Sequence, residues 1–152
     1  MSENKISATR HIDASAKEIF DFLTLPANHV QIDGSGFIRS VVHGDRIQEV
    51  GQVFTMNMEG EHMGGEYATD NHVSAYGTNK VVGWKTAPAG TEPPGWQWVW
   101  TLEGDGPDAT DVTITYDWSQ VTDKELLAKN IFPLVDEAGL EDSLAKLAAA
   151  VA

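Results

Sequence analysis

Two neighbouring stretches of the chain, 95–104 and 110–119, alternate between apolar and polar side chains, with Val99 as the exception. The apolar positions are Trp96, Trp98, Trp100 and Leu102 in the first stretch, and Val112, Ile114, Tyr116 and Trp118 in the second. A period of two predicts β-strands with one dry and one wet face, as in antiparallel sheets. The dry face needs a cover from elsewhere in the chain.

Further strands are predicted wherever β-forming runs are separated by Gly, Asp, Asn or Pro. Short turns between such runs are typical of an antiparallel meander. The expected strands are Lys5–Ile12, 37–43, 50–59, 65–76, 80–87, 95–104 and 110–119.

Helices are predicted after the first strand and at the end of the chain. Ser15 and Glu18 have the spacing of a capping box, and Pro26 can open a second short helix over 27–32. A second capping box at Thr122 and Glu125 precedes leucines at helical spacing, which predicts a long helix over 123–150. Pro133 predicts a kink in it. This helix is the expected cover of the dry face.

Three segments carry a resemblance to a known family. They are ISATRHIDASAKEIFDFL at 6–23, VSAYGTNKVVGW at 73–84, and the tail with FPL at 132–134 and LEDSLAKL at 140–147. The chain resembles the START-like (SRPBCC) superfamily, with its birch-pollen-allergen-like helix-grip fold, in particular the bacterial polyketide cyclase and lipid-transport branch. The resemblance implies an α+β fold in which a seven-stranded antiparallel sheet wraps a long C-terminal helix, with two short helices between strands one and two. It also implies a cavity for apolar ligands, but the fold alone names no function.

Composition restricts the partners. The 152 residues suit one domain, expected over 1–152, and the absence of cysteine excludes disulfides. A net charge of −13 argues against binding to nucleic acid or anionic membranes. With no apolar leader or long apolar run, we expect a cytoplasmic protein without membrane insertion, as a monomer or homodimer.

A metal or cofactor site is not expected. The five histidines form no helical pair, and without cysteine a metal site would need ligands from several strands. The Gly34–Gly36 turn lacks the lysine of a phosphate loop.

Large apolar side chains supply the candidate binding residues. Tryptophan buries much area and methionine adapts to irregular ligands, although each of these residues could equally be plain core. We expect the ligand to enter near the glycines of 60–65. The candidate ligand-binding residues are Phe54, Met56, Met58, Trp84, Trp98, Trp100, Tyr116, Trp118, Ile131, Leu134 and Val135.

Catalytic candidates are weaker, because each also fits an ordinary structural role. Acid–base chemistry on a ketone or enol needs an ionisable group inside the cavity. His62, in a glycine-rich junction, and Tyr116, on a dry strand face, are the first candidates. The others are Glu66, Tyr67, Asp70, His72 and Tyr76, with Asp70 and His72 spaced to pair.

Three functions stay open from the sequence. The first is binding or transport of a small hydrophobic ligand, lipid or polyketide-like, in an internal cavity. The second is a cyclase, dehydratase or aromatase, which needs an ionisable group with a perturbed pKa in the cavity. The third is a protein-interaction module, which would show a filled core and an exposed apolar patch.

Overall fold

The computed structural model describes residues 5–32, 38–43, 45–60, 65–91, 93, 95–121 and 137–151. Seven strands form one antiparallel sheet in the order β1-β7-β6-β5-β4-β3-β2. The strands are β1 (Lys5–Ile12), β2 (Ile38–His43), β3 (Val53–Gly60), β4 (Gly65–Gly77), β5 (Val81–Pro88), β6 (Gln97–Gly104) and β7 (Thr110–Asp117). The helices are α1 (Ala16–Leu23), the 3-10 turn η1 (Pro26–Asn28), α2 (His29–Ile32) and α4 (Glu137–Val151).

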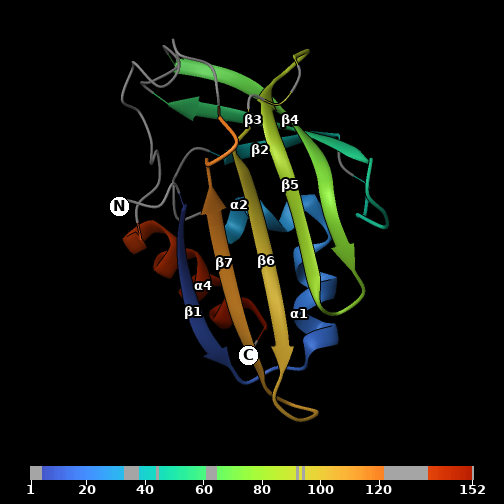
Figure 1. Ribbon diagram of the computed structural model, residues 1–152, viewed down its shortest axis with the longest axis vertical. Coiled ribbons are helices and arrows are strands. Elements are labelled where there is room, and N and C mark those ends of the chain that lie inside the picture. The colour runs from blue at the N-terminus through green and yellow to red at the C-terminus, as the bar shows by residue number, and fades with distance from the viewer. Residues whose placement is uncertain are drawn as a thin grey trace.

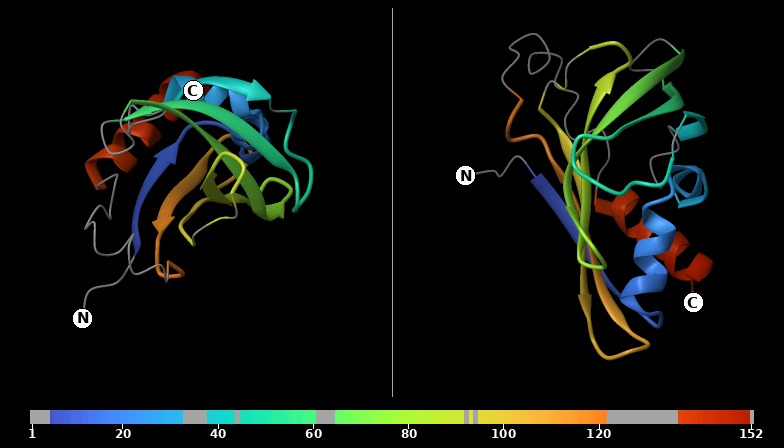
Figure 2. Two further views of the ribbon diagram at one scale, coloured as in Figure 1. Left: turned by 90° about the horizontal axis from the view of Figure 1, so that it is seen from above. Right: turned by 90° about the vertical axis from the view of Figure 1, so that its right-hand side faces the viewer.

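The chain runs through β2 to β7 as a meander, and β1 adds to the free edge of β7 (Figure 1). Because β1 and β2 lie at opposite edges, the segment α1–η1–α2 has to cross between them. These short helices and α4 lie on the same face of the curved sheet, as Figure 2 shows. The predicted antiparallel sheet with two short helices between its first two strands is confirmed.

The first helix begins where its capping box predicts. The Ser15 hydroxyl oxygen accepts a hydrogen bond from the Glu18 backbone N–H at 3.1 Å, and Ile19, Phe20 and Leu23 are buried on one side of the helix. Such a cap satisfies a donor that the first turn would otherwise leave unpaired. The capping box therefore sets the start of α1, and the buried side anchors the helix on the core.

The C-terminal helix lies over the β1 and β7 side of the sheet (Figure 1). Leu140, Leu144 and Leu147 are at most 1% exposed and share one side of α4. Residues 122–136, which include the predicted start of this helix and the Pro133 kink, lie outside the described residues. No described helix is long and apolar enough to cross a membrane.

Candidate ligand cavity

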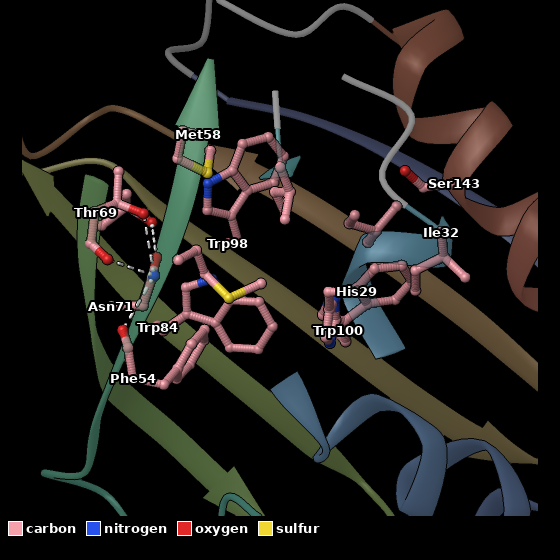
Figure 3. A pocket seen from close by; sticks show the side chains of 14 residues that line it. His29, Ile32, Phe54, Met58, Thr69, Asn71, Trp84, Trp98, Trp100 and Ser143 are labelled. Carbon is pink, nitrogen blue, oxygen red and sulfur yellow. Dashed lines mark hydrogen bonds between the residues drawn. The ribbon is translucent and has the colours of Figure 1, made fainter. Parts of the chain in front are cut away.

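A cavity of about 90 Å³ lies on the helix-facing side of the sheet (Figure 3). Most of its wall comes from the inner faces of β3 to β6, and the rest from β2, β7, α2 and α4. The described lining residues are His29, Ile32, Ile38, Phe54, Met56, Met58, Thr69, Asn71, Trp84, Thr86, Trp98, Trp100, Ile114 and Ser143.

Strand register explains how the large rings meet. Trp84 on β5 is paired with Trp98 on β6, and Trp100 is paired with Ile114 on β7. Directly opposed residues of antiparallel strands share a face, so all four point to the same side of the sheet. The Phe54 ring meets Trp84 edge-on at a centroid distance of 5.1 Å. These contacts give the cavity a largely aromatic wall.

Three polar side chains form a cluster on the same inner face. Asn71 on β4 is paired with both Phe54 and Thr86, and Thr69 lies two residues before it. The Thr86 hydroxyl donates to Asn71 Oδ1 at 2.7 Å, and Asn71 Nδ2 lies 3.3 Å from Thr69 Oγ1. Buried polar groups are costly unless they are hydrogen-bonded, and these bonds give the Thr86 hydroxyl and the Asn71 amide partners within the cluster.

His29 of α2 contributes a second polar group. Its Nε2 lies 2.7 Å from the Leu23 carbonyl oxygen, and its ring contacts the Trp84 ring edge-on at 5.1 Å. Because a carbonyl oxygen only accepts, the proton of this bond sits on Nε2. In the neutral ring, Nδ1 is therefore the basic nitrogen. Figure 3 shows His29 and the cluster around Asn71 on different sides of the cavity, with Trp84 between them.

The predicted binding residues divide into three groups. Phe54, Met56, Met58, Trp84, Trp98 and Trp100 line the cavity. Tyr116 and Trp118 are buried on the same sheet face and are not among the residues described in its wall. The Tyr116 ring stacks on Trp98 at 4.2 Å, so Trp98 covers it from the cavity side. Ile131, Leu134 and Val135 lie outside the described residues.

None of the catalytic candidates that the structure describes lines this cavity. His62 and part of the proposed ligand entrance at 60–65 lie outside the described residues. Asp70 does not form the pair with His72 that their spacing allows. Its carboxylate accepts instead from the Thr55 hydroxyl at 2.7 Å and the Gly90 N–H at 2.8 Å. The described wall contains none of Glu66, Tyr67, Asp70, His72 and Tyr76. The described residues also contain no cluster of three or more potential metal ligands.

Sequence reasoning missed the polar part of the wall. Thr69, Asn71 and Val73 alternate inward on β4, and register with the Phe54–Met58 face would have placed Thr69 and Asn71 beside it. Apolar periodicity gives no signal for Thr69 and Asn71, because both side chains are polar. His29 and Ser143 come from helices, and no periodic signal in the sequence relates them to the strands.

Comparison with known proteins supports the fold. No protein-family profile matches the chain. The uncharacterized protein Rv0088 of Mycobacterium tuberculosis is 29% identical over 147 residues, which cover 94% of this chain but 62% of that protein. The chain thus spans less than two thirds of this relative.

Solved structures resemble it over nearly the whole chain. Protein CV1439 from Chromobacterium violaceum is 18% identical, with a TM-score of 0.66 over 97% of this chain and 96% of that chain. The ZhuI aromatase/cyclase from Streptomyces sp. R1128 is 12% identical, with a TM-score of 0.65 over 96% of this chain and 92% of that chain. At these identities the likeness shows the fold and leaves the activity open. Strand order, helix placement and these structures together give the chain a helix-grip fold.

Proposed function

We propose that the protein binds a small, largely apolar molecule in the cavity between its sheet and helices. The observation that carries the proposal is the cavity wall of Trp84, Trp98, Trp100 and Phe54 with Met56 and Met58. Ligand pockets combine such apolar walls with a few fixed polar groups. Protein interiors are close-packed, so a cavity beside the largest side chains of a small domain is unusual and indicates a binding site.

Ligand binding is tested by closing the cavity. Met58→Trp adds bulk at the wall, whereas Val53→Trp on the same strand lies on the opposite face, where Val53 is 41% exposed. Small neutral aromatic compounds are titrated into each protein by isothermal calorimetry. We expect micromolar to millimolar binding to the unmodified protein and to Val53→Trp, and at least tenfold weaker binding to Met58→Trp. Binding that is equal in all three proteins would place the ligand elsewhere.

Catalysis on a bound ketone is the second candidate function, and the position of His29 favours it. The bond from Nε2 to Leu23 O fixes the ring and makes Nδ1 the basic nitrogen of a buried imidazole at the cavity wall. Such a base could remove a proton from the carbon next to a carbonyl and return it, as cyclisation and dehydration require. The aromatase/cyclase named above has the same fold, which is an argument by analogy.

The test for catalysis is deuterium exchange into the methyl group of acetophenone in heavy water, followed by proton NMR. If His29 is a base, the protein accelerates the exchange over buffer, and His29→Gln abolishes the acceleration while acetophenone still binds. If acetophenone binds but its exchange proceeds at the buffer rate, the protein binds the ketone without catalysing proton exchange, and the role of His29 as a base is refuted.

A further inference from the structure

The amide of Asn71 has one defined orientation. Its Nδ2 lies near two backbone carbonyl oxygens, Phe54 O at 3.3 Å and Thr69 O at 3.4 Å. Only the nitrogen suits that side, because an oxygen there would face two acceptors. The Thr86 hydroxyl donates to Oδ1 on the other side at 2.7 Å. The NH2 group is therefore held toward Thr69.

Within the described part of the chain, the cluster has one unused donor, the Thr69 hydroxyl, and one donor with only long bonds, Asn71 Nδ2. All three contacts of Asn71 Nδ2 are 3.3–3.4 Å long, beyond the usual range for N–H···O bonds. Thr69 Oγ1 accepts one of them, and its own O–H proton takes part in no hydrogen bond with the residues that the structure describes. Both side chains line the cavity and are only 5% and 4% exposed. Buried donors with weak partners favour a ligand that accepts hydrogen bonds.

The charge of the wall restricts the ligand further. None of the fourteen described lining residues is Asp, Glu, Lys or Arg. A carboxylate placed among them would lose its hydration without meeting a permanent cation. The net charge of −13 opposes the approach of anions as well. The wall therefore favours a neutral ligand over a fatty-acid anion.

The size and the aromatic walls of the cavity restrict the class of ligand further. The volume of about 90 Å³ is room for a compact molecule, and the surrounding rings present faces and edges to it. Aromatic rings pack favourably edge-to-face or in offset stacks, and methionine sulfur packs well against ring edges. A ring system thus fits these walls better than an extended acyl chain.

We infer that the cavity takes a neutral aromatic ligand with a carbonyl group, and that Thr69 O–H and Asn71 N–H donate hydrogen bonds to the carbonyl oxygen. This inference rests on the proposed function, since it names the ligand class and the orienting residues of the same cavity. The ring lies against Trp84 and Met56, and the carbonyl points toward β4. Thr86 positions the Asn71 amide through its hydrogen bond to Oδ1, and the inference requires no contact between Thr86 and the ligand.

Three probes of similar shape separate the contributions: acetophenone, ethylbenzene and benzoate. Affinities are measured at pH 8, where benzoate is ionised and an ordinary histidine is neutral. We expect acetophenone to bind about tenfold more tightly than ethylbenzene, which lacks the acceptor, and at least tenfold more tightly than benzoate. Equal affinity for acetophenone and ethylbenzene would refute the hydrogen bonds to the carbonyl oxygen. Benzoate binding as tightly as acetophenone, or more tightly, would refute the conclusion that the cavity prefers a neutral ligand.

Variants assign the effect to Thr69. Thr69→Val keeps the shape and removes the hydroxyl, so it should bring acetophenone and ethylbenzene within about twofold of each other. Thr69→Ser retains the hydroxyl and should keep the preference. Thr110→Val is the matched control, because Thr110 is also buried but donates to Ala14 O, away from the cavity. An unchanged preference in Thr69→Val would contradict the assignment.

The outcomes also separate this inference from the proposed function. Binding of ethylbenzene and acetophenone with equal affinity, lost in Met58→Trp, would retain an apolar binding cavity and refute the carbonyl subsite. If neither neutral probe binds at all, the proposed function fails and the inference fails with it.

Discussion

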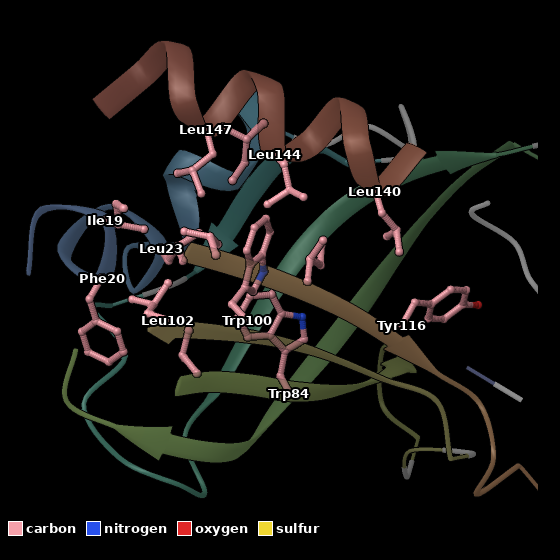
Figure 4. Close-up of a cluster of buried hydrophobic side chains, with 14 of the residues drawn as sticks. Ile19, Phe20, Leu23, Trp84, Trp100, Leu102, Tyr116, Leu140, Leu144 and Leu147 are labelled. Atoms are coloured by element: carbon pink, nitrogen blue, oxygen red, sulfur yellow. The ribbon is translucent and has the colours of Figure 1, made fainter. Parts of the chain in front are cut away.

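The inner face of the sheet has two regions that are built differently. Under α4 and α1 the space is closely packed, with Leu144 and Leu147 at most 1% exposed and Val112 fully buried. Figure 4 shows the leucines of α4 pointing toward the sheet. Toward β3, β4 and β5 the same face carries Trp84, Met56 and polar residues around a cavity (Figure 3). One face thus provides both a packed core and a hollow.

The difference follows from where the helices lie on the sheet. α4 packs mainly on β1 and β7, at one edge, so leucines close that region. The strands β3 to β5 belong to the other half of the curved sheet, where the described part of α4 contributes only Ser143 to the wall. Stability is therefore expected to depend most on the filled region, and ligand selection on the hollow one.

The largest stability effect is expected in the filled region. Leu144→Ala removes a buried side chain from a close-packed site, and should lower the free energy of unfolding by about 3 kcal/mol. Urea denaturation followed by circular dichroism measures the loss. The affinity of the folded variant for acetophenone should stay within about twofold, because Leu144 does not line the cavity. A tenfold loss of affinity would mean that the two regions are coupled.

A smaller stability effect is expected at the cavity wall. Met56 is 2% exposed, but it already borders empty space, so Met56→Ala removes fewer packing contacts than Leu144→Ala. We expect a loss near the low end for such substitutions, about 2 kcal/mol. The enlarged cavity should accept a naphthyl ketone better than the unmodified protein does. Denaturation and calorimetry on the same preparations check both parts; a stability loss above that of Leu144→Ala would show that the wall is ordinary core.

These two regions also differ in how well the sequence predicts them. The alternation of Trp98, Trp100 and Ile114 identified the inner face, and the capping box at Ser15 identified the start of α1. Periodicity defines a face but not the position of a residue along it, so Tyr116 was predicted at the cavity although it lies behind Trp98. Asn71 was overlooked because a hydrophobic pattern does not identify buried polar residues that form hydrogen bonds with one another. The register of three strands, which only the fold supplies, joins Phe54, Asn71 and Thr86 in one row.

The smallest effect is expected on the outer face, which belongs to neither region. His11 on β1 lies 2.8 Å from Asp111 on β7, and this hydrogen bond raises the pKa of His11 above its ordinary value of 6.5. A raised pKa in the folded state stabilises the fold fully below the unfolded pKa, and this stabilisation is lost as pH rises through the folded pKa. NMR titration of the His11 ring should show the raised pKa, and Asp111→Asn should return it toward 6.5. Ligand affinity should not change with this titration, whereas a change in step with it would contradict the separation of the two sites.

The five tryptophans provide the most direct test of the central claim that the hollow region is a binding site. Trp84, Trp98 and Trp100 line the cavity, whereas Trp96 and Trp118 are absent from its described wall. The measurement is a titration of ¹⁵N-labelled protein with acetophenone, following the five assigned indole N–H signals. We expect saturable shifts for Trp84, Trp98 and Trp100, with much smaller shifts for Trp96 and Trp118. Shifts of equal size in all five signals, or no saturable shift in the three cavity tryptophans, would contradict it.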